Sequence, residues 1–451
     1  MAKEKSKLGT EPIYDVRELG APRALVLGVQ HLFAMFGATI LVPILTGLNV
    51  STALLMAGIG TLLFHVITGG KVPAFLGSSF AFIAGYNIVS GGDPARLPYA
   101  CGGVFVAGFV YVAVAGLIKV IGPKRVMRFF PPVVTGPVII LIGLILSPAA
   151  LGGPGSGGIM DTLVRVKDGA TLPAGVNWLI ALAAIATIVV CNLWGRGMLK
   201  IVPILMGVIV GYVLALIFGI VDFSGLSGAG IIDIPIKADR FMKFEAGAII
   251  TIVPIALATM MEHVGDVSAI SATIGKNLIA KPGLHRTLIG DGLATSLASA
   301  VGGPANTTYG ENTGVLVLTR VYDPRVMQIA AVMAIIASFF PVVEGAIGSI
   351  PAVVIGGVSF ILYGMISAIG VRNMVENKVD LTKTRNLVVA AMILVSGLGF
   401  EFIGGLHFPV GDAVISFSGL AIAAIIGILL NAVLPGKDYE FVADDEEVLA
   451  E

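Results

Sequence analysis

Long apolar stretches separated by short polar or charged clusters run along the whole chain. Most are about 20 residues long, the length that an α-helix needs to cross a bilayer. Fourteen segments can be delimited, and the third and tenth are short and interrupted by small polar residues. Their approximate ranges are 24–47, 51–70, 74–91, 97–120, 130–151, 173–194, 200–221, 246–274, 285–302, 308–320, 325–343, 350–370, 384–402 and 411–434. This pattern predicts an all-α polytopic membrane protein.

The composition agrees with that prediction. Of the 451 residues, 56% are hydrophobic and only 12% are charged, whereas soluble domains average roughly 25% charged residues. The formal net charge of zero argues against nucleic-acid binding. Cys101 and Cys191 lie far apart in apolar segments, so they indicate neither a metal site nor a disulfide framework. The polar N-terminus leads into a full-length span, so we expect no cleavable signal.

The distribution of Lys and Arg tests the segment count. If the N-terminus is cytoplasmic, 22 of the 28 Lys and Arg residues fall in cytoplasmic loops or tails. Such an excess is the rule for multi-pass membrane proteins, and a wrong count would scramble it. We therefore expect fourteen spans with both termini in the cytoplasm.

The stretch Gly302–Arg320 departs most clearly from a plain membrane helix. It begins with Gly-Gly-Pro, continues through Asn306 and two threonines, and places Glu311 at the start of a short helix expected to end near Thr319. Gly and Pro interrupt helices, and broken backbone at membrane depth survives only inside protein or beside a wet cavity. A half-helix whose N-terminus carries a membrane acid is typical of a transporter's substrate site.

The third segment carries a related break. Gly77–Phe82 reads GSSFAF and Asn306–Glu311 reads NTTYGE, each with two hydroxyl residues, an aromatic residue and a small residue. Phe80 and Tyr309 are 229 residues apart, about half the chain. Seven spans in each half would invert the second half, because an odd number of crossings reverses its orientation. The two breaks predict inverted repeats around a midplane site, where Phe80 could stack on a flat ligand.

A cluster of ionisable residues lies in the middle of the eighth segment. Glu262 and Asp266 are four residues apart and share one helix face, and His263 lies between them in the sequence. Two such acids cannot both ionise cheaply in a low-dielectric site, so we expect one to bind a proton near neutral pH. Such a group suits proton coupling, while the alternative role is to hold helices together. His31 and Asp291 are expected to make hydrogen bonds between helices.

These motifs resemble those of one transporter family. The pattern of an acid followed by Asn-x-Gly-x4-Thr-Arg is met by Glu311, Asn312, Gly314, Thr319 and Arg320. Similar stretches cover nearly the whole chain: QHLFAMFGAT (Gln30–Thr39), PAFLGSSFAFI (Pro73–Ile83), EHVG (Glu262–Gly265), KPGLHR (Lys281–Arg286) and NTTYGEN (Asn306–Asn312). The chain thereby resembles the nucleobase–ascorbate transporter family, also called nucleobase:cation symporter-2, and within it the bacterial uracil permeases.

The resemblance implies fourteen transmembrane segments in two inverted repeats of seven, with short antiparallel β-strands in segments three and ten. It implies a core domain that moves like an elevator past a gate domain, in a homodimer in the bacterial inner membrane. The implied parts are a cytoplasmic N-terminal tail (1–23), a core domain (24–125 and 245–345), a gate domain (126–244 and 346–436) and a cytoplasmic acidic tail (437–451).

The resemblance also implies how a nucleobase is held. By position, Glu262 and Glu311 would bind the base, Phe80 would be an aromatic wall, and Ala38 would make a close contact. The backbone of Tyr309–Gly310 would donate amide N–H groups to ring carbonyls, while the carboxylates accept ring N–H groups. The implied substrate is uracil.

Proton coupling is implied for the same region. Glu262, Asp266 and Glu311 would carry or tune the coupled proton, with His31 and Asn312 in supporting positions. The expected protein is a symporter and not an enzyme, with no cofactor or metal besides the coupling proton.

Two features leave the substrate open between pyrimidines and purines. Asp266 stands where uracil permeases carry His and resembles purine-transporting relatives, whereas Glu311 favours the uracil branch because purine relatives usually have Gln. Xanthine or another purine is therefore the second candidate. An anion exchanger of the same fold is opposed by the three acids, and an intramembrane aspartyl protease would need a Gly-x-Gly-Asp motif that this chain lacks. A passive channel would not need titratable groups.

Overall fold

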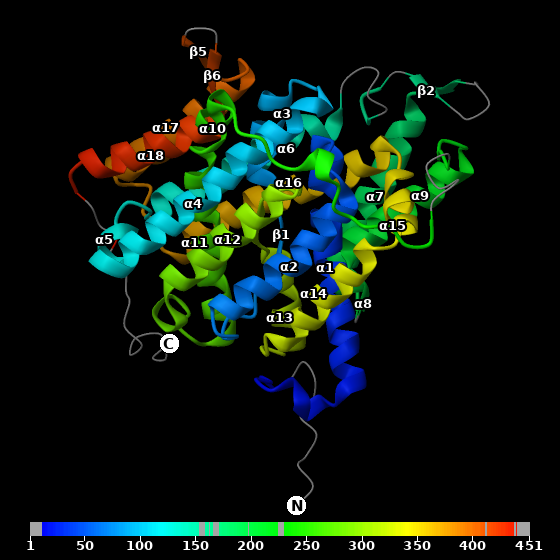
Figure 1. The fold of residues 1–451 in the computed structure, drawn as a ribbon, viewed down its shortest axis with the longest axis horizontal. Coiled ribbons are helices and arrows are strands. Elements are labelled where there is room, and N and C mark those ends of the chain that lie inside the picture. Colours follow the sequence, from blue (N-terminus) through cyan, green and yellow to red (C-terminus); the bar gives the residue numbers. More distant parts are fainter. Residues whose placement is uncertain are drawn as a thin grey trace, which may run out of the picture.

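The computed structural model describes residues 11–152, 158–161, 163–165, 171–196, 198–223, 230–410, 413–436 and 439. Figure 1 shows a bundle of tilted helices with β1 in its middle and with β5 and β6 protruding at one end. The expected acidic tail 437–451 lies outside the described residues except for Tyr439, as do residues 1–10 of the N-terminal tail.

The α-helices are α1 (Ala21–Thr46), α2 (Val50–Ile67), α3 (Ile83–Ser90), α4 (Leu97–Ile121), α5 (Pro123–Met127), α6 (Pro132–Leu151), α7 (Gly175–Trp194), α8 (Met198–Ile201), α9 (Pro203–Ile217), α10 (Ala246–Ile252), α11 (Ile255–Ile274), α12 (Leu284–Ala300), α13 (Gly310–Thr319), α14 (Arg325–Ser338), α15 (Pro341–Gly348), α16 (Ala352–Glu376), α17 (Thr384–Phe402) and α18 (Gly419–Val433). Shorter helical turns are η1 (Val16–Leu19), η2 (Phe80–Phe82), η3 (Pro94–Arg96), η5 (Ala238–Arg240) and η6 (Ile279–Gly283). The strands are β1 (Leu76–Ser78), β2 (Leu163–Arg165), β3 (Thr171–Pro173), β4 (Asn306–Thr308), β5 (Leu406–Val410) and β6 (Ala413–Phe417).

Among the described residues, eight helices are long and apolar enough to cross a membrane, or nine if α14 and α15 form one bent span. Each of the fourteen predicted segments contains a helix, but α3, α9, α12, α13, α14 and α18 have fewer than 18 residues and are not full spans on their own. The two interrupted segments contain the expected strands, β1 and β4, which pair antiparallel. The apolar stretches in the sequence therefore located the helices, but they did not show which helices are too short to span the membrane.

Two local expectations were wrong. The eighth segment is confirmed as one candidate span, 246–274, in which α10 and α11 are divided at Val253–Pro254, where Pro cannot donate to the helix ladder. The eleventh segment ends at α14, and the chain then bends by 86° into α15, which begins at Pro341. The fourteenth begins as strand β6, paired with β5, before α18 starts. The hairpins β2–β3 and β5–β6 also depart from the all-α expectation.

The helices pack as two groups. The first bundle comprises α1–α4 and α11–α14, in which α12 packs against α4 and α2 packs against both α12 and α14. The second bundle comprises α6, α7, α9 and α16–α18, in which α6 packs along α16, α7 along α9 and α17 along α18. Fewer contacts join the bundles, mainly from α1 to α9 and from α11 to α6 and α18.

Glycine allows the closest helix crossings inside each bundle. A Cβ atom at Gly108 of α4 would lie 2.4 Å from the carbonyl oxygen of Gly292 in α12. A Cβ atom at Gly370 of α16 would lie 2.6 Å from the carbonyl oxygen of Gly136 in α6. Neither helix pair could pack this closely with a larger residue, which is the role of small residues in membrane helices.

Candidate functional site

Two short strands, β1 and β4, pair antiparallel at the centre of the first bundle, and we call this pair the crossing. In the β1–β4 pair, Leu76 lies opposite Thr308 and Ser78 opposite Asn306. One further bond extends the ladder at each end: Ser79 N–H donates to Ala305 O (2.8 Å) and Tyr309 N–H donates to Phe75 O (3.0 Å). A helix begins directly after each strand, so the N-terminal ends of η2–α3 and α13 meet at the crossing.

This ladder corrects the equivalence expected between the two breaks. Ser79, one residue after β1, and Tyr309, one residue after β4, donate equivalent hydrogen bonds at the two ends of the ladder. Equivalent residues of the two breaks are therefore 230 positions apart in the sequence, and not the 229 expected from matching Phe80 with Tyr309. The structural counterpart of Phe80 is Gly310, because hydrogen bonding and not side-chain likeness sets the register.

Tight packing holds the crossing together. Gly77 of β1 lies under the ring of Tyr309, and a Cβ atom there would be 2.5 Å from the ring. The Tyr309 hydroxyl donates to Ser78 O (2.9 Å) and lies 3.2 Å from the Thr39 hydroxyl of α1. The side chain of Tyr309 is therefore buried and joins β1 to α1, and its backbone N–H, which donates to Phe75 O, is not the free donor that the family resemblance implied. Of the expected pair, Gly310 provides the amide in the first helical turn, where helices lack internal partners.

Glu262 and Asp266 lie on the face of α11 that meets this crossing. The Thr308 hydroxyl donates to Asp266 Oδ2 (3.0 Å). A Cβ atom at Gly310 would lie 3.5 Å from Asp266 Oδ1, so α13 begins against this carboxylate. Glu262 Oε2 is buried and has no hydrogen-bond partner among the described residues. The i,i+4 spacing places both acids on one face, as the sequence predicts.

These acids border a cavity of about 390 Å³, called here the central cavity. From the first bundle it is lined by Phe80, Glu262, Asp266, Tyr309, Gly310 and Glu311, among others. From the second bundle it is lined by Ile139 of α6 and by Ile366, Ile369 and Asn373 of α16. The cavity therefore lies between the two bundles. It extends to Arg372 and Glu376, whose side chains are exposed and paired with each other (2.6 Å).

Glu311 lies between two cavities. Besides the central cavity it lines a second one of about 430 Å³, which is bordered by α1, α8, α9 and α16. Gly310 and Gly314 line both cavities too. The Glu311 carboxylate at the start of α13 also lies at the positive end of the helix dipole, where a negative charge is favoured.

Phe80 forms the aromatic wall of the central cavity. Its ring lies edge-on to that of Tyr363 in α16, with the ring centroids 5.9 Å apart. Tyr363 connects the two bundles at this point, and sequence analysis did not single it out because one more aromatic residue in an apolar helix carries no signal. Thr308 and Asn373 were missed for a similar reason, since isolated polar residues reveal a partner only in three dimensions.

The two supporting residues, His31 and Asn312, contact each other. The Asn312 side-chain amide lies 3.1 Å from His31 Nδ1 and donates to His31 O (3.1 Å). These bonds tie α13 to α1, and both residues are buried. Ala38 is also fully buried in α1 but lies outside the lining of the central cavity. Its contact with a ligand stays a prediction.

Asp291 has a partner that the sequence did not reveal. Its Oδ2 atom lies 3.2 Å from His263 Nδ1, and both side chains are fully buried. The Thr308 hydroxyl lies 3.4 Å from the same nitrogen. Thr308 thus connects the His263–Asp291 pair to Asp266. Among the described residues, no group of three His, Cys, Asp or Glu side chains could hold a metal ion.

Comparison with known proteins places this site in a family. A sequence model of the permease family (Xan_ur_permease) matches residues 22–404. The chain belongs to the nucleobase–ascorbate transporter family. It is 43% identical to the uracil permease of Bacillus caldolyticus, over 95% of this chain and 96% of that protein. It is 41% identical to the uracil permease of Bacillus subtilis, over 99% of each chain.

Membership of this family makes the protein a multi-pass membrane transporter and not an enzyme. Solved structures of other transporters share its fold. The transmembrane domain of the cyanobacterial bicarbonate transporter BicA matches with a TM-score of 0.59 at 16% identity, over 93% of this chain and 99% of that one. SLC26A9 matches with a TM-score of 0.61 at 12% identity, over 93% of this chain and 66% of that one.

Proposed function

We propose that the protein imports uracil together with protons across the bacterial inner membrane. The observation that carries this proposal is the grouping of Glu262, Asp266 and Glu311 with Phe80 around one cavity. Full-length similarity to uracil permeases supports the choice of substrate. No bond is made or broken in the proposed reaction, so these residues act by binding alone.

The cavity has the chemistry that a pyrimidine requires. Uracil has two ring N–H donors and two carbonyl acceptors on a flat ring. Carboxylates such as Glu262 and Glu311 accept N–H groups strongly, and the Gly310 amide can donate to a carbonyl. Phe80 offers an apolar face to the ring. We propose Glu262, Glu311, Phe80 and Gly310 as the binding residues, with Ala38 and Tyr309 shaping the site from behind.

The coupling proton would bind within the group of three acids. With no basic residue among its lining except Arg372, which is paired with Glu376, the central cavity concentrates negative charge. Adding one proton relieves that repulsion. We propose that Glu262, Asp266 and Glu311 share this proton. We also propose that His31 and Asn312 hold α13 in place while the proton moves between these carboxylates.

Transport would proceed by an elevator-like motion of core against gate. The proposed core domain (24–125 and 245–345) contains the first bundle, and the proposed gate domain (126–244 and 346–436) contains the second. The cavity lies between them, and few contacts join them. Sliding of one bundle past the other would therefore carry the bound base without disrupting either interior.

The packing pattern supports two inverted repeats of seven spans. α2 packs against α14 as α12 packs against α4. Likewise α7 packs against α9 as α17 packs against α18, and α16 packs against α7 as α6 packs against α17. Each of these named contacts thus has a counterpart when the halves are exchanged. The charge distribution supports cytoplasmic termini, and the family resemblance supports a homodimer.

The structural neighbours include anion transporters, but the site differs from an anion site. An anion is favoured by positive charge at the paired half-helix N-termini, whereas this chain places Glu311 at the start of α13 and Glu262 and Asp266 beside it in the same cavity. We therefore propose a nucleobase and not an anion as the substrate.

The proposal is tested by uptake of labelled uracil into proteoliposomes, with and without an inward proton gradient and with unlabelled xanthine as competitor. Gradient-driven uptake that xanthine does not reduce is the expected result. Inhibition by xanthine would assign the site to purines, and gradient-independent flux would remove proton coupling. Absence of uracil uptake in active preparations would reject the proposal.

A further inference from the structure

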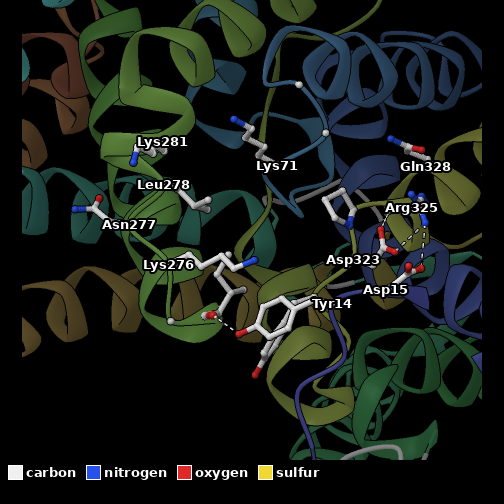
Figure 2. A pocket seen from close by; sticks show the side chains of 16 residues that line it. Tyr14, Asp15, Lys71, Lys276, Asn277, Leu278, Lys281, Asp323, Arg325 and Gln328 are labelled. Atoms are coloured by element: carbon white, nitrogen blue, oxygen red, sulfur yellow. Dashed lines mark hydrogen bonds and ion pairs between the residues drawn. The ribbon is translucent and has the colours of Figure 1, made fainter. Parts of the chain in front are cut away.

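A further, larger cavity of about 790 Å³ lies where Tyr14 and Asp15 meet the chain after α2, the end of α11 and the start of α14. We call it the lysine pocket. Figure 2 shows its lining: Lys71, Lys276 and Lys281 lie on one side, and Arg325 lies with Asp15 and Asp323 on the other. Tyr14 and Tyr322 complete its wall. None of these residues lines the central cavity.

The N-terminal arm, residues 11–20, forms one edge of this pocket. Ile13 pairs with the chain beside Val321 through two backbone bonds, from Ile13 N–H to Arg320 O and from Tyr322 N–H to Ile13 O, both 2.8 Å. The Tyr14 hydroxyl donates to Ile274 O at the end of α11 (2.8 Å). The pocket is thus a built structure in which distant segments are joined, and not a gap between loops.

The two acids of the pocket already have partners. Asp323 accepts the Val16 N–H on Oδ2 (2.8 Å) and the Arg325 N–H on Oδ1 (2.9 Å). Asp15 accepts from the side chain of Arg17 (2.6 Å) and lies 3.2 Å from Arg325 Nη1. The hydrogen bonds from Arg17 hold the pKa of Asp15 well below its usual range. Both carboxylates are therefore committed to the arm and to Arg325.

The lysine side of the pocket carries positive charge, with Lys71 and Lys276 lining the cavity and Lys281 also engaged in an interaction of its own. Lys71 follows a Gly-Gly turn after α2, Lys276 follows α11, and Lys281 lies in η6. Lys276 Nζ lies 4.1 Å from the centre of the Tyr14 ring, a cation–π contact that holds the ammonium group at the pocket edge. Each ammonium group offers up to three donors, and among the described residues the lining contains no acid besides Asp15 and Asp323.

We propose that the lysine pocket binds the phosphate group of a small organic phosphate or of a lipid headgroup. A phosphate monoester carries nearly two negative charges and three acceptor oxygens, and lysine binds phosphate as a point charge. The cavity exceeds the size of a phosphate ion and falls within the range of small-molecule sites, about 300–1,000 Å³. The half-exposed tyrosine rings leave an apolar surface for the remainder of the ligand. Access from the cytoplasm rests on the orientation proposed above.

Two probes separate the possible sources of the phosphate. The first is inorganic phosphate titrated onto the purified full-length chain in detergent, followed by the thermal unfolding midpoint, because a ligand that binds the folded state raises it. The second is reconstitution into nanodiscs of phosphatidylcholine with or without phosphatidylglycerol, with the same readout. Neither probe contains a nucleobase, so the outcome is independent of the proposed transport function.

Matched variants separate a site from a general effect of charge or salt. Lys71→Gln/Lys276→Gln removes two pocket ammonium groups, while Lys119→Gln/Arg286→Gln removes two exposed charges outside the pocket. Phosphate also stabilises proteins without binding to a site, an effect that both variants share. All four side chains are exposed, and gel filtration checks that each variant is folded and monodisperse.

The expected result is a saturable rise in the midpoint for the unmodified chain and for the control variant. In Lys71→Gln/Lys276→Gln, the apparent affinity should fall by about tenfold or more, the effect of losing charge-assisted bonds. A rise with inorganic phosphate identifies a soluble source, and a rise with phosphatidylglycerol alone identifies a lipid source. Equal behaviour of both variants, an unsaturable rise, or no rise with either probe would overturn the proposal.

Discussion

The two strand–helix units that meet at the centre of the molecule share a backbone plan but differ in chemistry. In the first unit, β1 leads through η2 into α3, and Leu76–Ser90 contains no acidic or basic residue. In the second, β4 leads into α13, which places Glu311 in its first turn. Their ladders are equivalent, with one flanking bond at each end. The two units are therefore similar in backbone structure, but only the second one places a charged side chain in the site.

The same asymmetry extends to the helices beside the crossing. α1 meets it with the Thr39 hydroxyl and has no acid, whereas α11 meets it with Glu262 and Asp266. One half of the chain therefore supplies an apolar wall with Phe80, and the other supplies the charge. For a flat, polar substrate this division is useful, because one surface can stack while the other exchanges hydrogen bonds and a proton.

Removing the charge of the second unit should have the largest effect. Glu311→Gln keeps the size of the side chain but replaces one carboxylate oxygen with an amide donor that cannot accept a ring N–H. Loss of a hydrogen bond to a charged group costs about 1.5–3 kcal/mol, so uracil affinity should fall about 10- to 100-fold. Labelled uracil binding and proteoliposome uptake both measure this change.

The matched control is Glu344→Gln. Glu344 accepts hydrogen bonds from Asn49 (2.5 Å) and Ser51 (2.7 Å), and it lines a different cavity. Uptake should persist in this variant. If Glu311→Gln transports uracil normally while the preparation is proton-tight, Glu311 does not belong to the binding site.

Adding a methyl group to the first strand should have the next largest effect. In Gly77→Ala, the new Cβ atom would meet the Tyr309 ring at 2.5 Å and the Thr39 hydroxyl at 2.6 Å. Overpacking of this kind costs about 1–3 kcal/mol. The thermal unfolding midpoint should fall, and uptake should fall with it because the crossing positions Glu311.

The opposing position in the second strand provides the contrast. Thr307 lies directly opposite Gly77 in the ladder, and Thr307→Ala removes atoms without creating a clash. We expect a smaller change in the midpoint than for Gly77→Ala. Equal or reversed effects would mean that the two strands are interchangeable and that the Tyr309 contact does not limit packing.

These positions also show what sequence can and cannot predict. Apolar length located a helix in every predicted segment, and the i,i+4 spacing placed Glu262 and Asp266 on one face, because both properties are local. The two breaks were found from Gly, Pro and small polar residues for the same reason. The strand pairing itself was expected only from the family resemblance.

Partnerships between distant segments were not predictable in the same way. Tyr309 and Phe80 look alike in the two motifs, yet the hydrogen-bond register makes Gly310 the counterpart of Phe80. The His263–Asp291 pair joins α11 to α12 and left no mark on the sequence. The docking of Ile13 beside Val321 was equally hidden, because a polar N-terminal tail gives no signal for the one apolar residue that anchors it.

Changing the apolar wall of the first unit should have a moderate effect. Phe80→Leu keeps an apolar side chain but removes the aromatic face from the central cavity. Aromatic pairs contribute about 0.5–1.5 kcal/mol beyond burial, so the KM for uracil should rise roughly two- to tenfold while the maximal rate changes little. Phe82→Leu is the control, because Phe82 is fully buried in the same turn and does not line the cavity. Its main effect should be on thermal stability, and a KM change as large as that of Phe80→Leu would contradict the stacking role.

The smallest effect is expected at Asp266, where the family resemblance led us to expect a histidine. Asp266 accepts the Thr308 hydroxyl and borders the start of α13, so it belongs to the charged side of the site without being its sole acid. Asp266→His introduces a side chain that can still pair with Thr308 and can still bind a proton near neutral pH. Uracil binding should therefore persist, and gradient-driven uptake should remain while its dependence on pH changes. If binding and uptake are lost together, Asp266 contacts the base directly. The charged wall of the site would then bind the substrate with three acids, and not with Glu262 and Glu311 alone.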